Sequence, residues 1–331
     1  MTDYLFRSRL LRLAAAPLSA AYLAALKLRP APEVTRLAAK VISIGNIHVG
    51  GTGKTPLVLA LARRLKALGA EPAIVSRGYR GRLSAVGAEV TADSSADDTG
   101  DEPLELARAL EAVPVFIGRD RVEAARKAML KGRVLILDDG FQHRRLHRDL
   151  DVVVIPGSSR PRDQRMLPLG RLREPLPALQ RADAVVLVRE VGEEESDPTA
   201  WKEWTDAPIF TAERIIDRVR PRRGTVDPVA LLGRKVVVFS GVANPSRFLR
   251  VVKSAGARIV EDIAFADHHV YTDQDLNLLN ILVMTHDAVA VTTEKDDARL
   301  GHRPLPFPTA VLSTSLTCDA FLDFCERRIP R

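Results

Sequence analysis

The stretch VISIGNIHVGGTGKTP, residues 41–56, decides the fold class. Four apolar or small residues run into a loop with three glycines in four positions, and a lysine and a threonine follow. A strand that ends in glycines and enters a helix directs several backbone N–H groups at one point, where the helix dipole adds about half a positive charge. The pattern therefore predicts a loop that binds a polyphosphate.

The side chains of this loop refine that prediction. The glycines leave room for the anion, Lys54 reaches the terminal phosphates, and the Thr55 hydroxyl is suited to binding Mg²⁺. The strict G-x-x-x-x-G-K-[ST] pattern is not met, because His48 occupies its first position, and a purely structural glycine turn is the alternative. The predicted nucleotide-binding residues of the loop are Gly50, Gly51, Thr52, Gly53, Lys54 and Thr55.

A second part of such a site is an acid at the end of a neighbouring buried strand. The stretch VLILDDG, 134–140, ends in Asp138 and Asp139. Two adjacent carboxylates are costly to hold close together unless a cation lies near them. With a phosphate loop in the same sheet, metal binding is favoured over a simple turn.

Short β-branched runs alternate with helical stretches along the chain, which indicates βαβ units and a mostly parallel sheet. The predicted fold class is α/β, with a P-loop NTPase-like parallel-sheet domain, a second, smaller α/β domain and an N-terminal amphipathic helix. We predict the helix over 1–30, the P-loop domain over 31–206, a linker over 207–230 and the second domain over 231–331. A cleft between two such domains is the natural ligand site. The expected strands are 40–45, 71–79, 133–140, 149–157, 181–190, 258–265, 287–296 and 308–316, and the expected helices are 56–69, 102–112, 120–130, 246–255 and 273–283.

The N-terminal head is the most basic part of the chain. The formal net charge is +7, and residues 1–40 contribute seven Lys or Arg against two acids, so the rest is nearly neutral. This distribution argues against a general nucleic-acid binder and for a local anionic partner surface. The uncharged run 13–26 is 14 residues long and contains Pro17, whereas a spanning helix needs roughly 20 apolar residues. A helix lying in the headgroup region of a membrane is favoured, with a helix packed on its own domain and a secretory signal as alternatives.

The overall composition is that of a folded globular protein, with 46% hydrophobic and 27% charged residues. Only Cys318 and Cys325 are present, seven positions apart on one face of an expected helix. This supports neither a metal site nor a disulfide framework, and it fits a reducing cytoplasm.

Three further stretches concern the group that accepts the phosphate. They are TGDEP (99–103), DDGFQHRRLHRDLD (138–151) and FADHHVY (265–271). The first places Asp101 at a helix start, and the second places Gln142 and His143 after the strand with the two acids. The third places His268 and His269 at a strand end that faces the predicted cleft, where a functional role is favoured over a structural one.

Together these stretches resemble the tetraacyldisaccharide 4'-kinases, the lipid A kinases of Gram-negative bacteria. They cover most of the chain in order, and several are typical of that family rather than of P-loop proteins at large. The residues that carry the resemblance are GNIHVGGTGKTP (45–56), SRGYRGR (76–82), GDEP (100–103), DDGFQHRRLHRDLD (138–151), LPLGRLREPL (167–176), FSGVANPSRF (239–248), FADHH (265–269) and TEKDDAR (293–299).

The resemblance implies that ATP phosphorylates the 4'-hydroxyl of a tetraacylated glucosamine disaccharide 1-phosphate, with Mg²⁺ as cofactor. It also implies a peripheral protein at the cytoplasmic face of the bacterial inner membrane, with this lipid and the membrane surface as partners; no protein partner is indicated. An Asp101–His268 pair would assist deprotonation of the sugar hydroxyl. The implied catalytic residues are Asp101, His268 and Lys54, the implied metal ligands are Thr55, Asp138, Asp139 and Glu174, and Gln142 and His143 join the phosphate loop as nucleotide-binding residues.

Several assignments stay open at this level. His269 is an alternative to His268, and TEKDDAR either contacts the nucleotide or caps a helix. The arginine-rich SSRPRDQRM, 158–166, departs from the family pattern. The anomeric phosphate suits the arginines of SRGYRGR or Arg119 and Arg121.

Two other function classes compete with the kinase. A membrane-associated switch ATPase usually carries a second lysine early in its phosphate loop, where this chain has Val49. An ATP-dependent ligase that forms an acyl phosphate is compatible with the phosphate loop alone.

Overall fold

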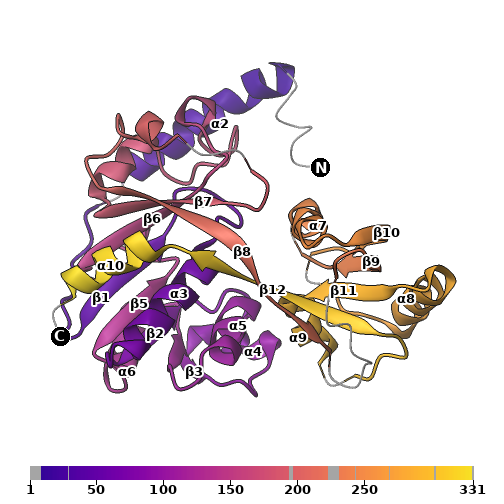
Figure 1. Ribbon diagram of the computed structural model, residues 1–331. Coiled ribbons are helices and arrows are strands. Elements are labelled where there is room, and N and C mark those ends of the chain that lie inside the picture. The colour runs from indigo at the N-terminus through magenta and orange to yellow at the C-terminus, as the bar shows by residue number, and fades with distance from the viewer. Residues whose placement is uncertain are drawn as a thin grey trace. The chain divides into compact units, whose positions relative to one another are not determined.

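The computed structural model describes residues 9–28, 30–193, 197–222, 231–242, 244–267, 269–301 and 303–329, which form two compact units (Figure 1). Unit 1 comprises Met1–Arg189, Glu194–Ala212 and Cys318–Arg331, and unit 2 comprises Glu190–Glu193 and Glu213–Thr317. The predicted boundaries differ from this division in two places. The expected linker 207–230 contains a 13-residue strand, β8 (Ile209–Pro221), and the last helix of the chain belongs to unit 1.

Unit 1 is built on a mostly parallel sheet with the order β7-β6-β1-β5-β2-β4-β3. Its neighbouring strands pair in parallel, except that β3 is antiparallel to β4. The strands are β1 (Lys40–Gly45), β2 (Pro72–Ser76), β3 (Ala88–Val90), β4 (Val115–Ile117), β5 (Val134–Asp138), β6 (Leu150–Pro156) and β7 (Ala184–Arg189), and the helices are α2 (Arg9–Lys27), α3 (Lys54–Ala67), α4 (Ala96–Thr99), α5 (Asp101–Ala109), α6 (Arg121–Met129) and α10 (Asp319–Arg328). The predicted α/β class with a P-loop strand–loop–helix is therefore confirmed.

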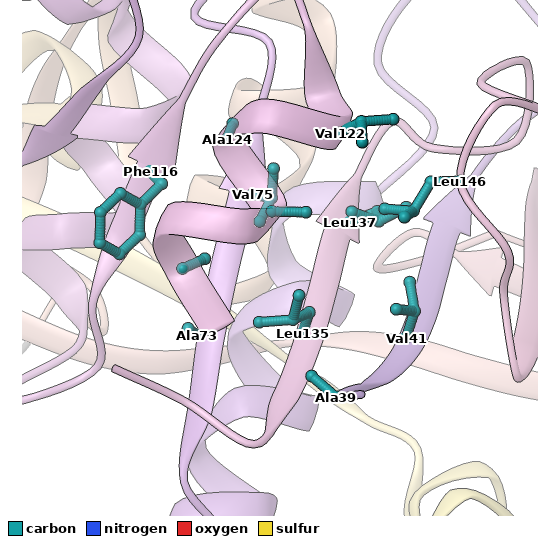
Figure 2. Packing of buried hydrophobic residues seen from close by; sticks show 12 residues of the cluster. Ala39, Val41, Ala73, Val75, Phe116, Val122, Ala124, Leu135, Leu137 and Leu146 are labelled. Atoms are coloured by element: carbon teal, nitrogen blue, oxygen red, sulfur yellow. The ribbon is translucent and has the colours of Figure 1, made fainter. Parts of the chain in front are cut away.

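Helices cover this sheet because its strands are apolar on both faces. Val75, Leu135 and Leu137 pack with Ala124 of α6 in one buried cluster (Figure 2). The alternate residues of these strands point to the opposite face, where α3 contacts β1, β2 and β5. A strand buried on both faces reads as a continuous apolar run, which is why VLILD was recognisable in the sequence.

Unit 2 is a smaller α/β unit with the strand order β10-β9-β11-β12-β8. The first four strands are parallel, and β8 is antiparallel to β12. The remaining elements are β9 (Lys235–Ser240), α7 (Pro245–Ser254), β10 (Arg258–Ala264), α8 (Asp273–His286), β11 (Val289–Thr293), α9 (Glu294–Leu300) and β12 (Thr309–Thr317). The strand expected over 287–296 ends early, because Thr293 caps a helix that begins at Glu294.

The N-terminal helix α2 contacts unit 1 through hydrogen bonds from Ser19 and Tyr22. The Ser19 hydroxyl donates to the carbonyl of Leu167 at 2.9 Å, and the Tyr22 hydroxyl donates to the carbonyl of Arg173 at 3.0 Å. Among the described residues, no helix combines the length and apolar character that crossing a bilayer requires.

Candidate active site

The phosphate loop joins β1 to α3 through backbone that only glycine adopts without strain. Gly53 precedes α3 with φ 92°, and a Cβ on it would lie 2.9 Å from Cγ1 of Val188. Gly50 has φ 100°, and a Cβ there would collide with the Arg171 guanidinium. Within the described part of the chain no side chain caps the start of α3, so its first turn presents the helix dipole directly to an anion.

Two polar contacts brace the loop from inside. Asn46 Nδ2 donates to the Thr52 hydroxyl at 2.9 Å, and both residues are buried. The side chain of Gln142 donates to the Asn46 carbonyl at 2.8 Å. Because each bond joins the loop to buried structure, the loop is fixed before any ligand binds.

A third brace comes from the segment that carries the LPLGRLREPL motif. The Val49 N–H donates to the Arg171 carbonyl at 2.8 Å, and the Arg173 N–H donates to the Ile47 carbonyl at 2.7 Å. The Arg171 guanidinium also donates to the Val49 carbonyl, at 3.0 and 3.2 Å. The residues before the glycines are thus paired with 171–173 like neighbouring strands.

Lys54 and the acids after β5 meet in this site. Lys54 Nζ lies 3.5 Å from Oδ1 of Asp139, and Arg173 Nη1 lies 2.9 Å from Oδ2 of the same carboxylate. Burial by itself would raise the pKa of Asp139, but the charges of Lys54 and Arg173 outweigh it and hold the pKa below its usual range. Asp139 is therefore an ionised acid between two cations.

Asp138 has a different environment. Its Oδ2 accepts from the Ser76 hydroxyl at 3.1 Å, while its Oδ1 is buried and has no hydrogen-bond partner in the part of the chain that the structure describes. Burial, together with the charge of Glu102, raises the pKa of Asp138 to about 7. An unsatisfied carboxylate oxygen of this kind fits a divalent cation, which would restore the ionised form.

Glu174 is buried and neutralised by its own partners. Its Oε2 accepts from Arg181 at 2.9 Å and from Arg144 at 3.2 Å, and its Oε1 accepts from Gln142 at 3.1 Å. The described residues contain no group of three or more His, Cys, Asp or Glu placed to hold one metal ion. Of the four predicted ligands, Asp138 has the unsatisfied oxygen that suits Mg²⁺, and the ligand roles of Thr55, Asp139 and Glu174 stay predictions.

His143 and Asp101 lie in unit 1 with the phosphate loop. Burial, with a contribution from the Arg121 charge, lowers the pKa of His143 to about 4, so this imidazole is neutral. Asp101 is the first residue of α5, and the charge of the next residue, Glu102, acts on Asp138. The GDEP turn and the strand end with the two acids are therefore neighbours.

The predicted partner of Asp101 cannot be placed in the same way, since His268 lies outside the described residues. The neighbouring His269 has a structural environment in unit 2. Its Nε2 lies 2.9 Å from Oδ2 of Asp275, and its ring stacks on Phe265 with centroids 4.6 Å apart. These contacts stabilise the turn that contains His269, and the choice between His268 and His269 for a chemical role stays open.

The TEKDDAR stretch forms a buried polar cluster in unit 2 as well as a helix cap. Asp296 is fully buried, and its Oδ1 accepts from the Tyr271 hydroxyl at 2.9 Å and from the Gly241 N–H at 3.0 Å. The Thr293 hydroxyl accepts from the Asp296 N–H at 3.1 Å, which caps α9. Of the two interpretations left open by the sequence, the helix cap is the one that the contacts match.

Two residues of the site, Arg173 and Asn46, carried no clear signal in the sequence. Arg173 and Asn46 brace Asp139 and the phosphate loop, but an arginine or asparagine in a loop has no distinctive spacing. Arg121 was one of the arginines considered for the anomeric phosphate, and its burial argues against that alternative. It is 4% exposed and donates to the carbonyls of Asp138 at 2.8 Å and Val75 at 3.3 Å, so it ties strand ends together.

A glycine-rich strand-to-helix loop with Lys54 and Thr55, beside a buried acid at the end of the adjacent parallel strand, defines a P-loop nucleotide-binding protein. Comparison with known proteins narrows this class. The profile of the LpxK family, tetraacyldisaccharide-1-P 4'-kinase, matches residues 11–326. The chain belongs to this family.

Individual relatives agree with that assignment. A tetraacyldisaccharide 4'-kinase of Nitrobacter winogradskyi is 40% identical over 286 residues, which is 86% of this chain and 82% of the relative. One from Syntrophus aciditrophicus is 37% identical over 306 residues, covering 85% and 81%. A crystal structure of LpxK from Aquifex aeolicus in complex with ATP matches with a TM-score of 0.77 and 30% identity, covering 97% of this chain and 100% of that one.

Proposed function

We propose that this protein transfers the γ-phosphoryl group of ATP to the 4'-hydroxyl of a tetraacylated glucosamine disaccharide 1-phosphate, in lipid A biosynthesis. The observation that carries the proposal is the braced phosphate loop with Lys54 beside the strand-end acids at 138–139. Family membership and the similarity to an ATP-bound structure support the choice of reaction.

The chain's own groups contribute to positioning and charge neutralisation, which phosphoryl transfer mainly requires. The loop amides and Lys54 bind the phosphates. The sugar oxygen forms a bond to the γ-phosphorus as the bond to ADP breaks, and its proton passes to Asp101, with His268 orienting that carboxylate.

Mg²⁺ would be held by Thr55 and the unsatisfied oxygen of Asp138, and it would neutralise charge on the phosphates. Asp139 is occupied by Lys54 and Arg173, so its participation as a ligand requires one of these cations to turn to the nucleotide. Likewise, Glu174 can bind the metal only if Arg144 or Arg181 turns away from it.

We further propose that α2 rests on the cytoplasmic surface of the inner membrane. Its outward face is apolar where its side chains are described, with Leu18 62% exposed, and Leu28 directly after the helix is 82% exposed; such a surface suits the headgroup region of a bilayer. The acyl chains of the substrate would then stay in the membrane while the sugar reaches the phosphate loop.

The test is an assay with labelled ATP, Mg²⁺ and the tetraacyldisaccharide 1-phosphate in detergent micelles. We expect a more acidic lipid product to form, and we expect no product when the metal is chelated. Lys54→Ala should reduce turnover by about 10²–10³-fold through lost phosphate stabilisation, while Lys66→Ala on the exposed side of the same helix should not. ATP hydrolysis without a lipid product would favour the switch ATPase, and full activity of Lys54→Ala would refute the site.

A further inference from the structure

The arginine loop, residues 160–171, is a cationic surface with no part in the proposed reaction apart from the contact of Arg171 with Val49. It carries four exposed arginines and one acid: Arg160, Arg162, Asp163, Arg165 and Arg171. Asp163 neutralises little of this charge, because it lies 3.9 Å from Arg162, whose side chain is 74% exposed.

The loop holds a defined shape, so its charges form a fixed surface. The Leu172 N–H donates to the Arg165 carbonyl at 3.0 Å, and the Gly170 N–H donates to the Met166 carbonyl at 2.9 Å. The Arg165 guanidinium donates to the carbonyls of Arg162 and Gln164, at 2.8 and 2.7 Å. The backbone bonds fix the course of the loop, and the last two bonds hold the Arg165 side chain against it.

The arginine loop also contacts the N-terminal helix α2. The Ser19 hydroxyl donates to the carbonyls of Leu167 and Met166, at 2.9 and 3.3 Å. On the rest of its surface α2 differs from an ordinary surface helix, whose outer face is polar. Its exposed residues with described side chains are all apolar, namely Ala16, Pro17, Leu18, Ala20, Ala21, Ala24 and Ala25.

An apolar helix face bordered by exposed arginines matches one kind of partner, an anionic bilayer. The apolar face suits the boundary between headgroups and acyl chains, and arginines beside it suit phosphate groups at the surface. A second copy of this chain would present the same positive loop and be repelled by it. The charge therefore selects the membrane over self-association.

We propose that the arginine loop is a docking site for anionic phospholipid headgroups that acts together with α2. The inference rests on the proposed membrane placement of α2, and it adds binding residues far from α2 in sequence. Arg171–Arg173 of the same segment also pair with the residues that precede the phosphate loop. Docking of the arginine loop thus sets the orientation of the ATP site toward the lipid surface.

The test uses the full chain and co-sedimentation with phosphatidylcholine vesicles that do or do not contain phosphatidylglycerol. One arginine near an anionic leaflet strengthens binding about fivefold, so Arg160→Gln/Arg162→Gln/Arg165→Gln should weaken binding to anionic vesicles about 100-fold. The single variant Arg162→Gln should lose about fivefold. The matched control is a triple substitution of exposed arginines elsewhere in unit 1, Arg63→Gln/Arg126→Gln/Arg133→Gln.

Equal losses in the two triple variants would overturn the proposal, because overall charge would then explain the binding. Lost lipid-kinase turnover in neutral micelles with unchanged vesicle binding would also overturn it, since the arginines would then contact the substrate. Charge-dependent vesicle binding by a protein without lipid-kinase activity would support the docking site and refute the proposed function. The two proposals therefore fail separately.

Discussion

Replacing Gly53 by alanine tests whether the phosphate loop depends on glycine for both conformation and space. Gly53 has φ 92°, and a left-handed conformation costs a residue with a side chain about 1–2 kcal/mol. The new Cβ would lie 2.9 Å from Cγ1 of Val188, which is 1% exposed and has no room to yield. Overpacking of this kind costs about 1–3 kcal/mol more. The total loss in the free energy of unfolding is thus about 2–5 kcal/mol.

Gly69→Ala is the matched control. Gly69 also has positive φ, 79°, but nothing lies within 4 Å of the position its Cβ would take. Its substitution should cost only the conformational part, about 1–2 kcal/mol, and should leave ATP binding unchanged. Urea denaturation measures the free energy of unfolding of both variants, and calorimetric titration measures their ATP affinity.

A double-mutant cycle then separates the two contributions. In a Val188→Ala background the contact is gone, so the cost of Gly53→Ala should fall to that of Gly69→Ala. Equal costs for Gly53→Ala and Gly69→Ala in the natural background would refute the argument from space. An unchanged cost in the Val188→Ala background would refute it as well.

Three further predictions concern single groups. Tyr271→Phe removes a donor to the buried Asp296 and should lower the free energy of unfolding by about 1–3 kcal/mol, whereas Tyr79→Phe at an exposed site should not. Burial lowers the pKa of His143 to about 4 from 6.5, so between these pH values the unfolded chain binds a proton that the folded protein does not. The free energy of unfolding should therefore decrease by about 1 kcal/mol as the pH falls from 6.5 to 4, after discounting for partial exposure. His143→Gln should abolish that part of the pH dependence in chemical denaturation. Asp101→Asn should reduce kcat by about 10²–10⁴-fold with little change in ATP affinity. Equal losses in kcat, measured by kinetics, and in ATP affinity, measured by calorimetry, would exclude a role of Asp101 as the base.

The fold class was predictable because the strands of unit 1 are apolar runs in the sequence, and two of them lead into glycines or acidic residues. The phosphate loop and the two aspartates at 138–139 were recognisable from their residue types and from their positions at strand ends. The extent of each unit was not predictable, since the strand at 209–221 alternates too weakly to separate it from an extended linker. The short strand β4 was missed for a related reason, because three residues carry no periodicity.

The contacts that brace the site were also beyond the sequence. Arg173 and Asn46 act through partners 34 and 6 positions away, respectively, and only the folded sheet brings the former pair together. Arg121 is the opposite case, in which the sequence suggested a contact that the structure does not allow. Its charge suggested a phosphate contact, but a helix that begins against the sheet directs the guanidinium inward, to backbone carbonyls.

The helix α10 has a consequence for the order in which the protein can be assembled. It follows unit 2 in the chain, yet it packs on unit 1, where Phe321 and Phe324 contact Phe210 and the carboxylates of Asp323 and Glu326 contact Arg64. A nascent chain on the ribosome therefore cannot close the nucleotide-binding unit until all of unit 2 has been translated. Premature termination or proteolytic trimming after residue 317 would leave unit 2 whole and damage the nucleotide-binding unit.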